Sequence, residues 1–576
     1  MPWIRPIFRN IRESVILLFF IVIVFNWIVY YPSFFQVGRA DQTIFLIETA
    51  RYDKLSELVK LTYSYPRTRQ LDKGDEVLLK PLCYFFMSFE KWLFGYHFIY
   101  WQLVGFLLHI LLLLQLYRIL NLIGTSSISV FFTLQFSLLT ISSDMVAWHH
   151  VSSYILFLIF LLEAFYQFIR YLQGGLSNEK NIIRMTASLT IACFLNDFGF
   201  MAVFAFLIML LFLEKLVFNK KSGENANGLK KKHAILGPGW LLMLPIVWYL
   251  VLDILDYMVH VKAPGLKIGL GSMSLNKIVH ALFYFFWLFV NGLLFPSFVY
   301  LYPTDRTILS DFSITDVLSK LIWTGDPLHV INLVFLIVLL IVLAYPLFVL
   351  KQGNAIPQQV KPELSPGTTK KIPSAASGAS FILAFLYLLY IVLGRMVVRN
   401  QYYILESSYH YYVFSLFVTI GVYGIFINCT ENFQKVDLNW RTSFSILLCL
   451  SIFLNGSQSY SMNNWRGTRE RPIGAFVRDL EGFVKEHKKE PDFSFRIVFR
   501  EVDKLIGVHI GNPAEKVLIK GYLTDNLFWN YVKDENVKYD LVYTQKDGLK
   551  SFTDKKRLEE YLAGMGKGIK QKILPY

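Results

Sequence analysis

Two lone carboxylates stand where a membrane-embedded chain can use them for chemistry. Asp41 follows the first long apolar segment, and Asp144 follows the third. A charged side chain costs free energy at membrane depth unless it finds a partner or lines a wet cavity, so acids at a membrane edge are functional candidates. A carboxylate beside an attacking hydroxyl group can accept its proton as a general base.

The segments that must position these acids are apolar. Of all residues, 54% are hydrophobic and 17% are charged, whereas about 25% are charged in soluble domains. Apolar runs near 20 residues recur along the chain, and each can cross about 30 Å of hydrocarbon. The first run is too long for a signal peptide and lacks a small-residue cleavage site. The sequence therefore predicts an all-α polytopic membrane protein.

Basic residues indicate the orientation of the spans. Three arginines precede the first span, residues 14–31, which predicts a cytoplasmic N-terminus and an external loop at residues 32–79. Lysine-rich loops farther along the chain agree with this orientation. The remaining spans are expected near residues 98–119, 128–141, 151–171, 185–195, 198–218, 236–255, 328–350, 379–398, 410–428 and 442–454.

Residues 277–302 test this topology, because they are apolar but contain Gly and Pro. If this segment crossed the membrane, the lysine-bearing linker at residues 351–377 would face outward, against the positive-inside bias. We favour a re-entrant or interfacial helix pair, which is tolerated where protein or a cavity surrounds it. About eleven crossings then result, with Asp41, Asp144 and Asp197 on the external face.

The chain becomes charged and basic after the last span. We expect a transmembrane domain at residues 1–454 and a small external α/β domain at residues 455–576. Apolar residues at helical spacing predict an amphipathic helix between residues 473 and 484. Short β segments are expected at residues 493–499, 516–523 and 539–544. The many lysines of this tail are interpreted as a solvated surface rather than a phosphate or glycan site.

Short motifs resemble those of the GT-C membrane glycosyltransferases. Lys80-Pro81-Leu82, Trp92-Leu93-Phe94-Gly95 and Leu107-Leu108-His109 are similar to the family's Arg-Pro-Leu, Leu-Phe-Gly and Leu-Leu-His runs. The most similar branch contains O-mannosyltransferases and bacterial lipid-A and glycan-decorating transferases. Asp144-Met145-Val146-Ala147-Trp148 resembles that branch's Glu-Ala-Val-Ala-Trp block, and Asn196-Asp197 stands where the family often has Lys-Glu. The resemblance covers roughly residues 14–430.

The sequence also departs from the family pattern. Asp41 is preceded by Ala40, where the family commonly has two adjacent acids. Thr140-Ile141 replaces a His-Pro pair, and a Glu-Arg-Tyr motif is echoed only by Asn400-Gln401-Tyr402 with Arg399 before it. The identity of the phosphate ligand therefore stays open. No tetratricopeptide repeats follow the membrane part.

The resemblance implies a sugar transfer from a polyprenyl-phosphate donor to a lipid, glycan or protein acceptor at the outer face of a membrane. That membrane would be the bacterial inner membrane, or the endoplasmic reticulum in a eukaryote. Asp41 would act as general base, and Asp144 would orient the acceptor or a divalent cation. Lys80, Arg399 and Arg395 would stabilise the leaving phosphate.

Other interpretations of these residues stay open. Asp144 could instead cap the helix that follows it. Trp148 and His149 are secondary candidates that also fit an interfacial anchor, and Tyr402 and Asp197 are secondary candidates as well. The four cysteines lack metal-type spacing and are expected to pack as small hydrophobic residues without disulfides. No metal site, firm cofactor or nucleic-acid partner is expected.

Two alternative functions share the lipid-linked donor. One is a flippase or transporter that moves a lipid-linked glycan without breaking a bond. The other is a polymerase or ligase of lipid-linked glycans. Acids clustered on one side favour the enzyme, because a carrier should place charged or broken-helix features near the membrane midplane.

Overall fold

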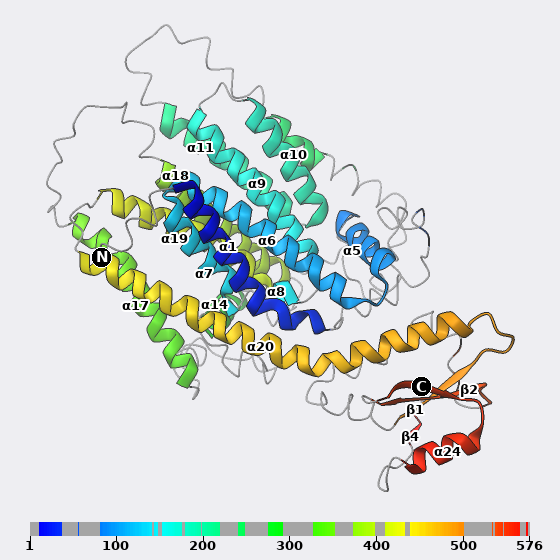
Figure 1. Ribbon diagram of the computed structural model, residues 1–576. Coiled ribbons are helices and arrows are strands. Elements are labelled where there is room, and N and C mark those ends of the chain that lie inside the picture. The colour runs from blue at the N-terminus through cyan, green and yellow to red at the C-terminus, as the bar shows by residue number, and fades with distance from the viewer. Residues whose placement is uncertain are drawn as a thin grey trace.

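The computed structural model describes residues 11–36, 54, 56, 81–140, 143–147, 152–174, 179–196, 198–218, 240–247, 251, 275–291, 327–351, 372–397, 409–432, 438–499, 531, 533, 536–544, 547–564 and 572–573. Within these ranges the protein is a bundle of helices followed by a small sheet near the C-terminus (Figure 1).

The helices of the bundle follow the apolar runs of the sequence. In chain order they are α1 (Ile11–Tyr30), η1 (Tyr31–Phe35), α5 (Pro81–Phe94), α6 (Phe98–Ile123), α7 (Ser126–Leu138), α8 (Ser143–Ala147), α9 (Ser152–Gly174), α10 (Glu179–Leu195), α11 (Phe198–Phe218), η5 (Trp240–Met243), α14 (Leu275–Asn291), α17 (Pro327–Lys351), α18 (Ile372–Leu389), the π-helix η9 (Tyr390–Val397), α19 (Tyr409–Asn432) and α20 (Leu438–His487).

Four helices in the described part of the chain are long and apolar enough to cross a membrane. They are α6, α9, α19 and the helix formed by α18 with the start of η9. Shorter apolar stretches lie in α1 with η1, α7, α11 and α17. The prediction of a helical protein with several potential spans is therefore confirmed, whereas the count of about eleven stays a prediction.

Small residues allow the helices to approach closely. A Cβ atom at Gly424 of α19 would overlap the Ser377 hydroxyl of α18. Ser377 Oγ in turn donates to the Gly421 carbonyl oxygen at 3.0 Å. Such contacts replace the hydrophobic effect as the source of attraction between helices in lipid.

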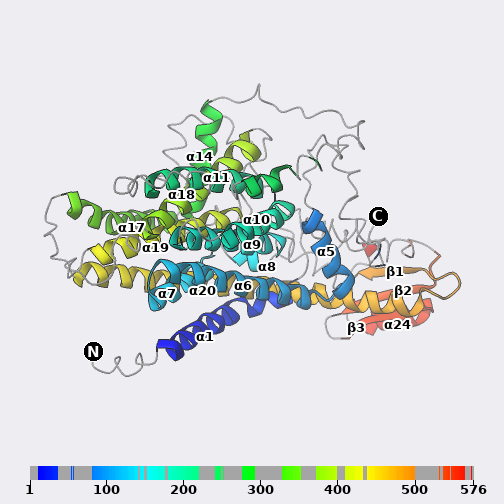
Figure 2. The same cartoon turned by 90° about the horizontal axis from the view of Figure 1, so that it is seen from above.

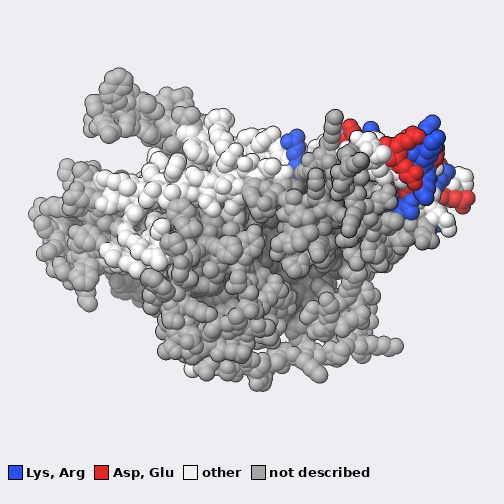
Figure 3. Space-filling view, turned by 90° about the horizontal axis from the view of Figure 1, so that it is seen from below, with Lys and Arg blue, Asp and Glu red and all other residues white. Residues whose placement is uncertain are grey.

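Large apolar side chains cover the outside of the bundle. On α20, Ile446 is 62% exposed and Phe453 is 70% exposed. On the face shown in Figure 3, the described Lys, Arg, Asp and Glu residues gather at the C-terminal end of the molecule, while the described surface of the bundle on this face shows few of them. This division of the surface fits a bundle solvated by lipid and a C-terminal part solvated by water.

The free cysteines occupy two different environments. Cys83 and Cys193 are buried, as expected for small hydrophobic residues, whereas Cys449 is exposed on the apolar face of α20. The side chain of Cys429 lies outside the described residues.

The sheet combines strands from the end of the chain. It contains β1 (Phe495–Phe499), β2 (Tyr539–Thr544), β3 (Gly548–Phe552) and β4 (Lys572–Ile573), in the order β3-β2-β1-β4, with α24 (Lys555–Gly564) between the last two strands of the chain. β1 and β2 are parallel, and the other two pairs are antiparallel. The strands expected at residues 493–499 and 539–544 are confirmed, and the one at residues 516–523 lies outside the described residues.

The long helix α20 joins the bundle to the sheet. It runs for 50 residues without a break, which corresponds to about 75 Å, and Figures 1 and 2 show it leaving the bundle to reach the strands. The expected domain boundary between residues 454 and 455 thus falls inside one helix. The amphipathic helix expected at residues 473–484 is confirmed as the last third of α20, with Phe476, Val477, Leu480 and Val484 buried.

Candidate functional site

The short helix α8, which carries Asp144, is enclosed by the bundle. It contacts α1, α6, α9, α19 and α20, and Figure 2 shows it among these helices. Met145, Val146 and Ala147 are all buried. The backbone of the Asp144 segment is therefore held by packing on several sides.

Hydrogen bonds hold α8 at both of its ends. On the N-terminal side, the Thr140 amide and hydroxyl groups both donate to Asn455 Oδ1 at 3.0 Å. On the C-terminal side, Gln102 Nε2 donates to the Ala147 carbonyl oxygen at 2.8 Å. The last carbonyl groups of a helix lack partners within the helix, so Gln102 satisfies one of them. These bonds are buried, which makes them costly to break.

The segments that flank the other predicted site loops meet at the same end of the bundle. η1, which precedes the Asp41 loop, contacts α6 and α20. Phe198, which follows Asp197, packs its ring against Tyr387 at 4.8 Å between ring centroids. The Tyr387 hydroxyl lies 3.1 Å from Nδ1 of His410, at the start of α19. We call this end, formed by η1, α5, α8, η9 and the first turns of α6, α9, α11 and α19, the α8 end.

Most of the residues predicted to act in the site are not described by the structure. Asp144 and Arg395 lie within α8 and η9, but their side chains are outside the described residues. The other predicted residues also lie outside: Asp41, Lys80, Trp148, His149, Asp197, Arg399 and Tyr402. Their chemical roles stay predictions. The π-helix η9, which contains Arg395, is consistent with a functional site at this end, because π-helical turns are frequent at functional sites.

His109, from the Leu107-Leu108-His109 motif, is the centre of a buried hydrogen-bond network. Its Nδ1 lies 2.9 Å from the Tyr412 hydroxyl, and its Nε2 lies 3.2 Å from Asn26 Oδ1. Because an amide oxygen only accepts, Nε2 carries the proton and Nδ1 accepts from Tyr412. Asn26 Nδ2 donates to Ser137 Oγ at 2.9 Å. The motif histidine thus joins α1, α6, α7 and α19, which is a structural role.

Glu90 of α5 is a buried carboxyl group that was not among the residues predicted from the sequence. It is 2% exposed, and Oε2 accepts from the Ser152 hydroxyl at 3.5 Å. Oε1 has no hydrogen-bond partner among the described residues. Burial raises the pKa of Glu90 well above its usual range, and the Ser152 hydrogen bond opposes this only in part. Burial therefore favours the neutral, protonated form of the Glu90 carboxyl group.

The sequence carries a signal for Glu90. The acid stands in an apolar, aromatic segment and is flanked by Phe89 and, two positions later, by Trp92. An acid among apolar residues requires a partner or a function. This reasoning applies to Glu90 as it does to Asp41.

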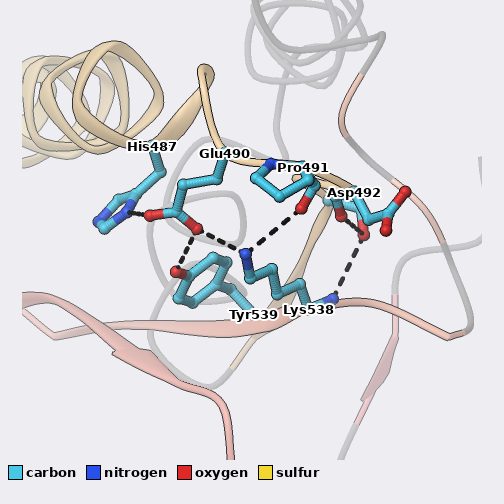
Figure 4. Close-up of polar contacts among 7 residues, drawn as sticks. His487, Glu490, Pro491, Asp492, Lys538 and Tyr539 are labelled. Atoms are coloured by element: carbon cyan, nitrogen blue, oxygen red, sulfur yellow. Dashed lines mark hydrogen bonds and ion pairs between the residues drawn. The ribbon is translucent and has the colours of Figure 1, made fainter.

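A second carboxyl group organises the C-terminal end of α20 (Figure 4). Glu490 accepts hydrogen bonds from His487 Nδ1 at 2.6 Å and from the Tyr539 hydroxyl at 2.8 Å. Its other contact is an ion pair with Lys538 Nζ at 2.8 Å. These hydrogen bonds lower the pKa of Glu490 to about 2. The largest contribution comes from His487, followed by those of Lys538 and Tyr539. The cluster connects α20 to β2.

No family model matches this sequence, and no curated protein matches it. Within the described residues, no group of three or more His, Cys, Asp or Glu side chains is placed to hold a metal ion. Functional inference therefore depends on the geometry of the α8 end and on the chemistry of its residues.

Proposed function

We propose that the protein is a GT-C type membrane glycosyltransferase that uses a polyprenyl-phosphate sugar donor. The observation that carries the proposal is the enclosure of α8, with Asp144, by five helices at the end of the bundle where the flanks of the other site loops meet. An acidic residue in a segment enclosed by apolar helices is costly unless it serves a function. Apolar helices around it suit a lipid-linked donor.

The proposed reaction is a displacement at the anomeric carbon of the sugar. The acceptor hydroxyl oxygen forms a bond to this carbon while the bond to the phosphate oxygen breaks, and its electron pair leaves with the phosphate. Asp41 takes the hydroxyl proton as general base. Lys80, Arg395 and Arg399 stabilise the charge that develops on the phosphate. Asp144 orients the acceptor or a divalent cation.

Glu90 fits this proposal as a neutral polar group. α5 begins at Pro81, directly after Lys80, and packs against α6, α9 and α10. A protonated carboxyl group can donate and accept hydrogen bonds without adding negative charge near a phosphate. Burial of Glu90 therefore suits a site that binds an anionic donor.

One observation favours a carrier as the second candidate. Glu163 lies in the middle of α9 and forms an ion pair with Arg118 of α6 at 3.3 Å. Gln115 and Gln167 also donate to its carboxylate. Charged groups at such depth are typical of transport pathways. However, both oxygens of the Glu163 carboxylate already accept from these neighbours, which suits a structural link between α6 and α9.

A transfer assay separates the two candidates. The purified full-length protein in nanodiscs is incubated with defined polyprenyl-phosphate sugars and with lipid, glycan or peptide acceptors that carry a free hydroxyl group, and the release of polyprenyl phosphate is measured. The transferase predicts cleavage of at least one donor. The same protein in liposomes, scored for movement of an intact fluorescent donor between leaflets, tests the carrier. Movement of the donor without cleavage would overturn the transferase.

A further inference from the structure

A polar stripe runs along the face of α20 that packs on the bundle. Its members repeat every fourth residue, and side chains at this spacing lie on the same face of a helix. The stripe consists of Ser451, Asn455, Ser459, Asn463 and Gly467, all of which are buried. Such a stripe in a helix that leaves the bundle requires partners, and the structure supplies them from two segments of the α8 end. Farther along α20, residues outside the stripe contact a third segment.

The first partner is the segment that leads into α8. Asn455 Oδ1 accepts from both the amide and the hydroxyl group of Thr140 at 3.0 Å. Asn455 Nδ2 donates to the Ser451 carbonyl oxygen at 3.0 Å, which fixes the orientation of the amide. One turn later, Ser459 Oγ donates to the Leu138 carbonyl oxygen at 3.2 Å. The connection between α7 and α8 is therefore hydrogen-bonded to α20.

The second partner is the end of α1 with η1, which precedes the first predicted external loop. Asn463 Nδ2 donates to the Val29 carbonyl oxygen at 3.1 Å. A Cβ atom at Gly467 would overlap the carbonyl oxygen of Pro32. The Arg471 guanidinium lies over the Phe35 ring at 4.7 Å from its centroid. Backbone contact at Gly467 leaves no room for a side chain between α20 and η1.

The third partner is the corner between α5 and α6. Trp101 Nε1 donates to the Gly95 carbonyl oxygen at 3.0 Å. Gly95 has φ +53°, and a Cβ atom there would lie 3.3 Å from Glu481 Oε1 of α20. Around this contact, one hydrophobic cluster joins the bundle to the sheet; it includes Tyr96, Phe98, Trp101, Phe476, Leu480, Val484, Phe495, Ile497 and Leu541.

We propose that α20 is a brace that holds three segments of the α8 end in place, namely the connection into α8, the end of α1 with η1, and the corner between α5 and α6, with Asn455 as the positioning residue for α8. The first two contacts of the brace adjoin predicted site residues, because Asp144 lies in α8 and Asp41 follows η1 in the sequence, whereas the third contact lies at the opposite end of α5 from Lys80. The C-terminal domain then serves to anchor the far end of the brace. The catalytic consequence rests on the proposed function, whereas the structural coupling does not.

Loss of the Asn455 side chain leaves two buried donors of Thr140 without an acceptor. The segment before α8 is then expected to shift or open locally, because unpaired buried donors are costly. Misplacement of a reacting group by about 1 Å can lower turnover by about 10²-fold. Asn455→Ala should therefore lower kcat by roughly 10-fold or more, with a smaller change in the donor KM.

Hydrogen exchange of the full-length protein in nanodiscs measures the coupling without reference to activity. In Asn455→Ala, the amides from Leu139 to Ala147 should exchange faster than in the wild type, while those of α18 and α19 should not change. Asn464→Ala is the matched control, because Asn464 lies on the exposed side of the same helix. If Asn455→Ala does not fold, Thr140→Val removes one of the two bonds and carries the same test.

A double variant tests whether Asn455 acts on α8 through its hydrogen bonds with Thr140. If Asn455 acts through Thr140, Asn455→Ala combined with Thr140→Val should lose little more than Asn455→Ala alone. Gly467→Ala should likewise speed exchange in η1, whereas Gly482→Ala on the same helix meets nothing within 4 Å and should not.

The outcomes separate the brace from the proposed function. Unchanged exchange near α8 in Asn455→Ala, or an equal rise throughout the bundle, would overturn the brace. A wild-type protein that cleaves no donor would overturn the proposed function and leave the exchange result to decide the brace. Faster exchange confined to α8, with kcat affected more than KM, would support both.

Discussion

At the scale of single residues, burial and hydrogen bonding move the pKa values of two carboxyl groups in opposite directions. Glu90 loses its water without gaining a cation among the described residues, so its neutral form is favoured. Glu490 stays accessible and is surrounded by donors, so its charged form is favoured. The two residues therefore predict opposite dependences of stability on pH.

For Glu90, stability should fall as pH rises. The unfolded chain releases this proton near the ordinary pKa of 4.5, whereas the folded protein keeps it to a higher pH. Above pH 4.5 the folded state therefore binds more protons than the unfolded state, and stability declines until the raised pKa is passed. Glu90→Gln should show a smaller decline in melting temperature between about pH 5 and pH 8.

The control for this measurement is Glu486→Gln on the exposed face of α20. It should follow the pH dependence of the wild type. A wild-type melting temperature that changes with pH in the same way as that of Glu90→Gln would mean that folding does not raise the pKa of Glu90.

For Glu490, stability should fall as pH decreases. Its folded pKa of about 2 lies below the ordinary value of 4.5. The contribution of the cluster is therefore complete above pH 4.5 and is lost between pH 4.5 and about 2. In Glu490→Gln the stability of the C-terminal domain should fall less steeply as the pH decreases. The rate at which pepsin cleaves the domain at each pH measures this change. The prediction fails if Glu490→Gln and wild type become sensitive at the same pH.

At the scale of elements, the sequence predicts where apolar helices lie better than it predicts whether a helix continues beyond its apolar part. Helices α6, α9, α11 and α19 begin and end close to the expected positions, because a long apolar run is a local signal. The expected domain boundary at residue 454 falls inside the continuous helix α20, because the polar residues that follow it resemble a soluble tail in sequence. They instead form hydrogen bonds with Thr140, in the connection between α7 and α8, and with the Val29 carbonyl oxygen of α1.

The pair α18 and α19 offers a matched test of helix packing. Gly424→Ala would place a Cβ atom against Ser377 and Pro373, so it should destabilise the pair. Gly378→Ala meets nothing within 4 Å and should stabilise its helix by up to about 1 kcal/mol through helix propensity. Thermal unfolding in detergent measures both. Equal effects of the two variants would mean that the close approach at Gly424 does not exist.

At the scale of the whole molecule, the sequence indicates which residues could perform chemistry, but it does not indicate which long-range contacts position the segments that carry them. Thr140 and Asn455 are 315 positions apart, and His109 and Tyr412 are 303 apart. No local pattern reports such pairs. The prediction that the site loops gather at one end comes from the parity of the expected spans, whereas the contacts of α20 and the burial of Glu90 depend on three-dimensional packing.

The orientation of the molecule is open to a labelling test. Ser551 of β3 is exposed in the C-terminal domain. Ser551→Cys, in a background with the four native cysteines replaced, should react with an impermeant thiol reagent on intact cells if the predicted orientation, with this domain outside, is correct. Reaction only after permeabilisation would reverse the orientation and move the α8 end to the cytoplasmic face.

The most direct test of the proposed transferase is the turnover of carboxylate variants with a cleavable polyprenyl-phosphate sugar. Asp41→Asn should lower kcat on the order of 10²-fold or more while donor binding is retained, because it removes the general base. Asp479→Asn, an exposed acid on α20, should leave turnover unchanged. Near-normal turnover in Asp41→Asn would contradict the mechanism and transfer the role of base to Asp144.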